Sequence, residues 1–357
     1  MKRKRICLLH VPVFNPARAI GGAEVIAVDV VRWLSEENDV TVLHGFLGEP
    51  AEPTATDYPA EIVPGFRLGD HGFKQLGHIR PDFTAAAMET VTSADVIMSV
   101  ENSLDMPTPT ARVVLMGGVG YPHTHDIMRH RSWDRLVVPS SMVARQVSEA
   151  VGSNPQVTVI ENGIDTNLFS PNGDRPDSRP LRLLIPSRPT LDKGFARAAE
   201  LTSALTAAGY AATLVIFDQP DGFSQEGLRG LAAESACDVE ILPWQPRSAM
   251  PGIYCDADLT LCLGTAVEGF GLVAAESVAC GTPVLSHSGG FLKEMLPADH
   301  GLYHADPALP AWQLAQEALS AVRAGRRQCQ QYGRPYIENR YSLRRMGEQF
   351  TDLMRAL

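Results

Sequence analysis

The sequence lacks the cysteine patterns of a disulfide-stapled or zinc-binding protein. Its six cysteines include no C-x-x-C pair, and most of them stand in apolar segments. We therefore predict reduced thiols in the core, with neither a disulfide framework nor a zinc site. An excess of positive charge is also missing, because the net charge is −10 over 357 residues. This balance argues against nucleic-acid partners and against more than peripheral contact with a membrane.

We expect neither a membrane span nor a cleavable leader. The longest uncharged segment, residues 201–217, contains Gly209, several threonines and many alanines, which predicts a helix, a turn and a strand. The basic start MKRKR precedes only a short apolar run that His10 and Pro12 interrupt, and no small-residue cleavage site follows. We interpret this start as a buried first strand, and we expect a cytoplasmic protein.

The sequence does contain two successive halves in which strand-like and helix-like segments alternate. Residues 171–180, PNGDRPDSRP, have three prolines and no large apolar residue, which is typical of a linker. The pattern predicts an α/β protein with a domain at 1–170 and a second at 181–341, each a doubly wound parallel sheet. Ligands of such sheets bind beyond the carboxyl ends of the strands, so we expect the domains to face each other across a ligand-binding cleft.

The segment EGFGLVAAESVACGTPVLSHSGG, residues 268–290, places two acids eight positions apart around a glycine-containing turn. We predict a helix that Gly281 ends, followed by a strand at TPVLS. Amide groups at the start of such a helix favour an anion, and Glu276 could accept hydrogen bonds from vicinal hydroxyls such as those of a ribose. An ordinary helix with a glycine entry and a surface glutamate explains these residues equally well. The amides concerned are those of Phe270, Gly271, Leu272 and Val273.

Two further sites carry residue types suited to phosphate. Arg188 and Lys193 follow the first strand of the second half, where two cations could hold a diphosphate, although solvated loop charges are the alternative. Gly21 and Gly22 follow the first strand of the chain and allow close approach of a phosphate to the helix after them. A simple strand-to-helix turn would also account for these glycines.

Together these motifs resemble the retaining glycosyltransferases of family 4, which have the GT-B fold of two Rossmann-like domains. The resemblance rests on E-x7-E at 268–276, A-C-G-T-P-V at 279–284, GGAE at 21–24, NGIDTNLFSP at 162–171 and R-x4-K-G at 188–194. It implies that Arg188 and Lys193 stabilise the leaving nucleotide diphosphate, that Glu268 holds the donor sugar and that Glu276 holds the ribose. It also implies that the C-terminal helix, residues 342–357, packs back on the first domain. We assign NGID at 162–165 to a turn without a catalytic role.

The resemblance also implies a catalytic histidine near the reacting carbon of the donor. His123 is the nearest match, with His125 and His130 as the alternatives in the same segment. The D-A-D at 256–258 resembles the metal-binding motif of the other glycosyltransferase fold, but we interpret it as structural because the family is metal-free. The sequence departs from the family's glycine-containing turns at 217–220 and 242–246, where the donor base is expected. There Trp244 is a candidate either for stacking on that base or for the core.

The sequence thus predicts a retaining, metal-independent glycosyltransferase with no cofactor, which moves a hexose unit from a nucleotide-diphosphate sugar. The expected acceptor is a hydroxyl group on a glycan, a glycoside or a lipid-linked glycan. A sugar-nucleotide epimerase or hydrolase on the same fold, or a non-catalytic sugar-nucleotide-binding subunit, are the alternatives.

Overall fold

The computed structural model divides the chain into two compact units. Unit 1 consists of residues 1–163 and 343–357, and unit 2 of residues 164–342. The division lies at residue 163, seven residues before the end predicted for the first domain, and most of the predicted linker lies outside the described residues. The structure describes residues 2–11, 14–16, 21–46, 48, 58–67, 77–106, 108–120, 122–152, 154, 156–172, 180–187, 191–218, 225–234, 236–287 and 289–357.

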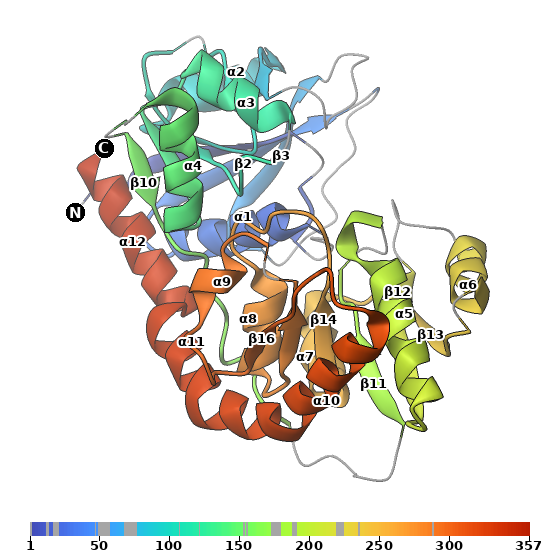
Figure 1. Ribbon diagram of the computed structural model, residues 1–357. Helices are drawn as coiled ribbons and strands as arrows, with labels where there is room; N and C mark the ends of the chain where they lie inside the picture. The colour runs from blue at the N-terminus through green and yellow to red at the C-terminus, as the bar shows by residue number, and fades with distance from the viewer. Residues whose placement is uncertain are drawn as a thin grey trace. The chain divides into compact units, whose positions relative to one another are not determined.

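Unit 1 is built on an eight-stranded sheet in the order β10-β9-β8-β6-β1-β2-β3-β5 (Figure 1). All neighbouring strands are parallel except β3 and β5. The strands are β1 (Arg5–His10), β2 (Asp39–Phe46), β3 (Glu61–Arg67), β5 (Asp82–Phe83), β6 (Val96–Val100), β8 (Ala111–Leu115), β9 (Arg135–Val138) and β10 (Val157–Val159), while β4 (His78–Ile79) and β7 (Ser103–Leu104) form a separate pair.

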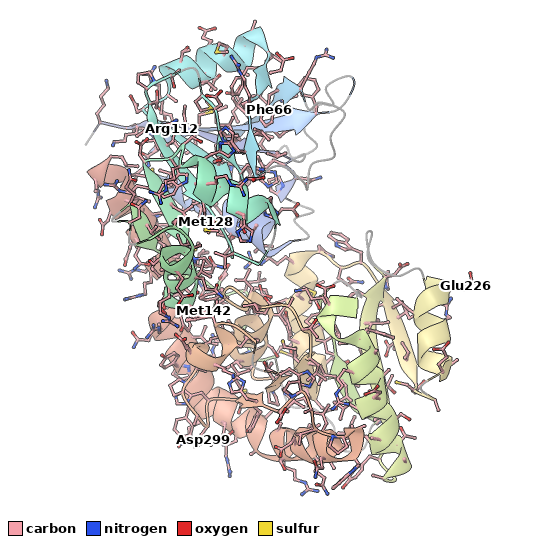
Figure 2. All side chains as sticks on the ribbon, turned by 45° about the horizontal axis from the view of Figure 1, so that its top comes forward. Phe66, Arg112, Met128, Met142, Glu226 and Asp299 are labelled. Atoms are coloured by element: carbon pink, nitrogen blue, oxygen red, sulfur yellow. The ribbon has the colours of Figure 1, made fainter. Side chains whose placement is uncertain are left out.

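Five helices accompany this sheet in the described part of unit 1: α1 (Gly22–Leu34), α2 (Ala85–Ser93), α3 (Pro122–His130), α4 (Ser141–Val151) and α12 (Leu343–Ala356). One core cluster joins α2 to Phe66 of β3, and a second joins α3 and α4 through side chains such as Met128. Figure 2 labels both of these buried side chains. The C-terminal helix α12 belongs to this unit, and its Thr351 Oγ1 accepts a hydrogen bond of 3.0 Å from Trp33 Nε1 on α1.

Unit 2 is built on a six-stranded parallel sheet in the order β13-β12-β11-β14-β15-β16. The strands are β11 (Leu181–Leu184), β12 (Ala212–Asp218), β13 (Val239–Pro243), β14 (Leu259–Cys262), β15 (Val284–Ser286) and β16 (Leu302–His304). Near-continuous apolar runs such as ATLVIFD form these strands, as expected for a parallel sheet that helices cover on both faces.

The helices of unit 2 pack on the two faces of this sheet. They are α5 (Phe195–Ala207), α6 (Gln225–Glu234), α7 (Met250–Asp256), α8 (Leu272–Ala279), α9 (Leu292–Met295), α10 (Ala311–Gln328) and α11 (Arg334–Arg340), with a π-helical turn between the last two. Residues of α5 and α10 share a core cluster with Leu259 and Leu261 of β14. The intervening Thr260 points to the other face, where its hydroxyl accepts a hydrogen bond of 2.7 Å from Ser277 of α8. Glu226 and Asp299 lie on the surface (Figure 2).

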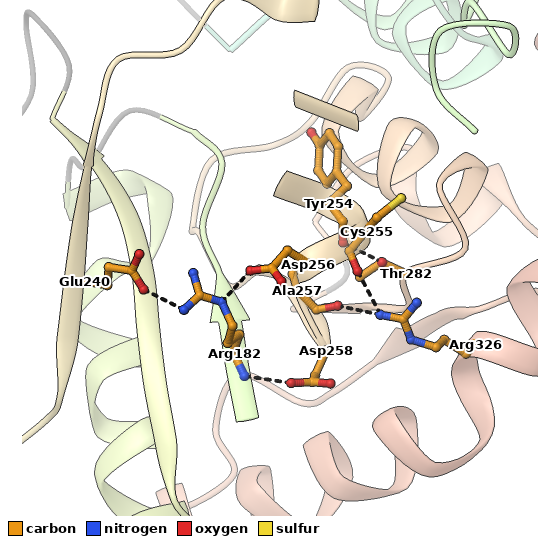
Figure 3. Close-up of polar contacts among 9 residues, drawn as sticks. All are labelled: Arg182, Glu240, Tyr254, Cys255, Asp256, Ala257, Asp258, Thr282 and Arg326. Carbon is orange, nitrogen blue, oxygen red and sulfur yellow. Dashed lines mark hydrogen bonds and ion pairs between the residues drawn. The ribbon is translucent and has the colours of Figure 1, made fainter. Parts of the chain in front are cut away.

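An ionic network closes the amino-terminal edge of the unit 2 sheet (Figure 3). Arg182 contacts Glu240 at 2.6 Å and Asp256 at 2.8 Å, and Asp258 accepts the Arg182 backbone N–H at 2.8 Å. Both acids of the D-A-D motif therefore serve to hold β11 beside the segment that leads into β14. This arrangement agrees with the structural role predicted for them.

In both units the sequence of strands reverses at a pair of neighbouring parallel strands. In unit 1 the pair is β1 and β6, and in unit 2 it is β11 and β14. Two loops leave such a pair toward opposite faces, which opens a crevice at the carboxyl edge where doubly wound proteins bind ligands.

Candidate active site

Lys193 reaches the reversal point of unit 2 because the loop after β11 packs directly against the loop after β14. Lys193 ends a short 3₁₀ helix, and Gly194 is the N-cap residue of α5 with a φ of +82°. A Cβ atom on Gly194 would overlap the backbone of Leu263 and Gly264, and Thr265 N donates to the Asp192 carbonyl at 3.0 Å. The glycine of the K-G pair therefore serves this close approach of two backbones.

Glu268 lies on the loop after β14, and its carboxylate contacts Lys193. Glu268 Oε1 is 2.9 Å from Lys193 Nζ, and the two side chains are 38% and 23% exposed. The sequence analysis assigned both residues to the donor, Lys193 to its diphosphate and Glu268 to its sugar. In the structure their side chains form an ion pair with each other. The nearby Cys262 stays a neutral thiol, because burial raises its pKa to about 12, with a further rise from Glu268. Two of the predicted site residues therefore form an ion pair with each other at the carboxyl edge of the unit 2 sheet.

The start of α8 presents its amides beside Glu268. Gly271 caps the helix with a φ of +101°, and a Cβ atom there would overlap the side chain of Leu292. Leu272 and Val273 follow as the first two helical residues, whose N–H groups have no acceptor within a helix. Phe270 has a buried ring that stacks on Phe291 with 5.7 Å between centroids, so only its backbone could serve a ligand.

Glu276 lies one turn inside α8 and is held by two donors. Tyr254 Oη donates to Glu276 Oε2 at 3.0 Å, and Arg247 Nη2 approaches Oε1 at 3.5 Å. Burial, and then the charge of Glu276, raise the pKa of Tyr254 well above its ordinary value, so the phenol remains a donor. The glutamate is 8% exposed and is therefore not the surface residue that the alternative interpretation required. Its carboxylate is fixed in orientation, as a group that binds hydroxyls must be.

The end of α7 is clamped so that Tyr254 stays in place. Thr282 Oγ1 donates to the Tyr254 carbonyl at 2.6 Å, and Arg326 Nη2 donates to the carbonyls of Cys255 and Ala257 at 3.1 and 2.9 Å (Figure 3). The sequence analysis missed Tyr254 and Arg247. The signal for them is weak, because they lie 22 and 29 positions from Glu276.

In unit 1, Gly21 and Gly22 lie at the start of α1, directly after the loop that follows β1. Gly21 has an extended backbone with a φ of −96°, and its N–H donates to Glu24 Oε2 at 3.0 Å. A Cβ atom on Gly21 would meet Glu24 Oε2 at 3.9 Å, which is an ordinary contact. Neither backbone strain nor packing within the described residues requires this glycine, so the prediction that it leaves room for a phosphate stays a prediction.

The three histidines predicted as alternatives have different surroundings. His123, in the first turn of α3, is half-buried, and its Nε2 lies 3.2 Å from Glu101 Oε2. His125 is exposed, and His130 is exposed and stacks on His78 with 4.0 Å between centroids. His123 is therefore the histidine that is paired with a carboxylate. The sequence analysis missed Glu101, although this acid directly follows the strand-like run ADVIMSV, residues 94–100.

The remaining predicted site residues are Arg188 and Trp244. Arg188 lies outside the described residues. Trp244 follows the edge strand β13 and is half-buried, so it is not a core tryptophan, and its stacking on a base stays a prediction. Among the described residues, no group of three or more His, Cys, Asp or Glu side chains is arranged to hold a metal ion. No helix in that same part of the chain is both long and apolar enough to cross a membrane.

Comparison of the sequence with known proteins finds a family model that matches much of the second half of the chain. Residues 171–334 match the model of the family described as Glycosyl transferases group 1. The D-inositol 3-phosphate glycosyltransferases of Mycobacterium bovis and Mycobacterium tuberculosis are 29% identical over 231 residues, which are 61% of this chain. The match spans 45% of the length of these relatives.

Solved structures share the fold over the whole chain. Sucrose-phosphate synthase from Thermosynechococcus elongatus superposes with a TM-score of 0.77 at 17% identity, covering 99% of both chains. Anabaena Alr3699/HepE, solved in complex with UDP-glucose, gives a TM-score of 0.74 at 16% identity, covering 99% of this chain and 100% of that one. These structures and the two doubly wound sheets establish the GT-B fold. Through residues 171–334 the chain is therefore similar to the group 1 glycosyltransferases, in the half that contains the E-x7-E and R-x4-K-G motifs.

Proposed function

We propose that this protein is a retaining glycosyltransferase that moves a hexose unit from a nucleotide-diphosphate sugar to a hydroxyl acceptor. The observation that carries the proposal is the convergence of three features at the reversal point of unit 2: Lys193, Glu268 and the start of α8. A cation, helix-terminal amides and a carboxylate are the groups that a diphosphate and a sugar require side by side.

Each group has a separate part in the proposed donor complex. Lys193 and the amides of Leu272 and Val273 bind the diphosphate, while Glu268 accepts hydrogen bonds from the sugar hydroxyls. Glu276 accepts hydrogen bonds from the ribose, with Tyr254 and Arg247 holding its carboxylate in position. Arg188, five positions before Lys193, is proposed as the second cation on the diphosphate.

Charge develops on the diphosphate as the bond to the sugar breaks, and Lys193 and the helix amides stabilise it. In the proposed retaining reaction the acceptor hydroxyl attacks the same face of the sugar that the phosphate leaves. A departing phosphate oxygen then takes the acceptor proton. Because Lys193 and the amides supply the positive charge, we propose that the reaction needs neither a metal ion nor another cofactor.

The relatives suggest what the two substrates are. The Anabaena structure contains UDP-glucose, and the mycobacterial relatives are named for transfer to D-inositol 3-phosphate. We therefore propose UDP-glucose as the first donor to test, and a hydroxyl on a glycan, a glycoside or a lipid-linked glycan as the acceptor. All six cysteines are free, which supports the proposal of a cytoplasmic protein.

The test begins with thermal shift measurements on UDP, ADP, GDP and their glucose conjugates, because a ligand that binds only the folded protein raises its Tm. Transfer from the best donor is then measured with and without EDTA, and the anomeric configuration of the product is read by NMR. We expect retention, no loss of rate in EDTA, and a loss of about 10-fold or more for Lys193→Ala.

The outcomes separate the alternatives. Epimerised or hydrolysed donor without an acceptor would favour an epimerase or a hydrolase. Donor binding without turnover for any acceptor would favour a binding subunit. Full transfer activity in folded Lys193→Ala and Glu276→Ala variants would refute the assignment of the site.

A further inference from the structure

Glu101 lies in the loop after β6 in unit 1, and Glu268 lies in the loop after β14, the corresponding strand of unit 2, six residues beyond its end. Glu101 is the first residue after β6, and β6 pairs with β1 at the point where the strand order reverses. Its backbone is fixed there, because Glu101 N donates to the Leu115 carbonyl at 2.8 Å. Its side chain thus starts at the edge of the sheet where doubly wound domains bind ligands.

The backbone of Glu101 is in a conformation that glutamate rarely adopts. Its φ is +58°, which lies in the left-handed region where side chains other than those of glycine, asparagine and aspartate are unfavourable. Such outliers persist only where the surroundings impose them, and they concentrate at functional sites. A glycine or an asparagine would fit this backbone with less strain, so the strain points to a role for the carboxylate.

The carboxylate of Glu101 contacts two neighbouring elements, the loop after β8 and helix α3. Oε1 accepts the backbone N–H of Gly117 at 2.7 Å, in the loop after β8, and Oε2 lies 3.2 Å from His123 Nε2 on α3. The first contact leaves the second oxygen directed at the imidazole. An ionised carboxylate can only accept, so this contact selects the ring tautomer with its proton on Nε2.

We propose that Glu101 is the positioning residue for His123: it fixes the ring and keeps Nδ1 as the basic nitrogen. The inference rests on the proposed function and adds to it a role for His123, the nearest match to the histidine that the resemblance implies near the reacting carbon. A carboxylate that orients a histidine in this way fixes which ring nitrogen can accept a hydrogen bond from a substrate hydroxyl.

The first experiment reads the tautomer and needs no substrate. Protein labelled with ¹⁵N on the histidine rings is studied by long-range ¹H–¹⁵N spectra at pH 8, and His123→Ala identifies the signals of His123. We expect a protonated Nε2 in the wild type. In Glu101→Gln the amide oxygen stays on the Gly117 N–H and the NH₂ group faces the ring, so the proton should move to Nδ1. An unchanged tautomer would overturn the proposal.

The second experiment uses kinetics. We expect Glu101→Gln to lower kcat on the order of 100-fold with the donor KM changed less than about threefold. In a His123→Ala background the same change should have no further effect, because residues that act as one unit are not additive. A full additional loss in that background would show that Glu101 does not act through His123. Glu149→Gln, an exposed glutamate on α4, is the matched control and should keep full activity.

A second variant protects the test against misfolding. Glu101→Asn fits the left-handed backbone but is too short to bridge Gly117 and His123, so we expect a folded protein with the same loss of kcat. Wild-type activity in Glu101→Asn would refute the proposal. Failure of the proposed function looks different, since a wild type that transfers to no acceptor would still show whether Glu101 sets the tautomer of His123.

Discussion

The contact between Lys193 and Glu268 leads to a prediction in which one substitution has opposite effects on two ligands. Without a donor, Glu268 neutralises Lys193 at 2.9 Å. If Lys193 binds the diphosphate and Glu268 binds the sugar, this ion pair must separate when the donor enters. In Glu268→Gln the lysine has lost its competing anion, so UDP should bind more tightly. UDP-glucose should react more slowly, because the carboxylate that holds its sugar is gone.

The size of each effect follows from the geometry. At an effective dielectric constant of about 20 the two charges attract by about 6 kcal/mol, but ion pairs as exposed as this one contribute a net of about 1 kcal/mol at most. Release of Lys193 should therefore strengthen UDP binding by up to about fivefold. Hydrogen bonds from sugar hydroxyls to a carboxylate contribute about 1.5–3 kcal/mol, so kcat/KM for UDP-glucose should fall roughly 10- to 150-fold.

Isothermal titration calorimetry with UDP and steady-state kinetics with UDP-glucose measure the two effects. Glu317→Gln removes one exposed charge from α10 of the same unit and is the matched control, with both quantities expected to be unchanged. Lys193→Ala should weaken UDP and UDP-glucose alike. Weaker or unaltered UDP binding in Glu268→Gln would refute the idea that the pair competes with the diphosphate.

Three further predictions concern residues that hold a site residue in position or stabilise one of the two units internally. Tyr254→Phe removes the hydroxyl that donates a hydrogen bond to Glu276, so the KM for the nucleotide sugar should rise by about 5-fold or more. Steady-state kinetics measure this KM, and thermal denaturation should show that the protein stays folded. Gly347→Ala would push a methyl group into the ring of Trp33, so the free energy of unfolding should fall by about 1–3 kcal/mol in denaturant titrations, with UDP binding unchanged. Arg182→Met leaves Asp256 and Glu240 without this partner and should lower Tm by several degrees, with kcat unchanged at 20 °C.

Much of the second half of the chain could be predicted from its sequence, because its signals are local. The helix before Gly281 and the strand after it are present, and Gly281 has the positive φ of +82° expected after a helix end. The 18-residue helix α10 was missed although its buried residues follow the helical spacing of three and four positions, at Leu314, Ala315, Ala318, Ala321 and Gly325.

In the first half, strand β3 was missed because its sequence, EIVPGFR, contains residues that disfavour a strand. The structure accommodates Pro64 and Gly65 through a shift of register between His44 and Gly45 of the neighbouring strand β2. A bulge of this kind is created by the pairing of two distant segments, so the local sequence does not announce it. The prediction failed at the place where tertiary structure overrides local preference.

The chemistry of the candidate site was predictable only one residue at a time. Sequence spacing singled out Lys193, Glu268 and His123, since each matches a motif or a residue type on its own. It could not show that Lys193 contacts Glu268 or that His123 contacts Glu101, since these partners lie 75 and 22 positions apart. In each pair the acid follows the second of the two strands at which the strand order reverses, β14 or β6. A doubly wound sheet brings the loops that follow these strands to one edge whatever their sequence. The topology therefore determines which loops meet at this edge of the sheet. The residues on those loops determine which charged side chains come into contact there.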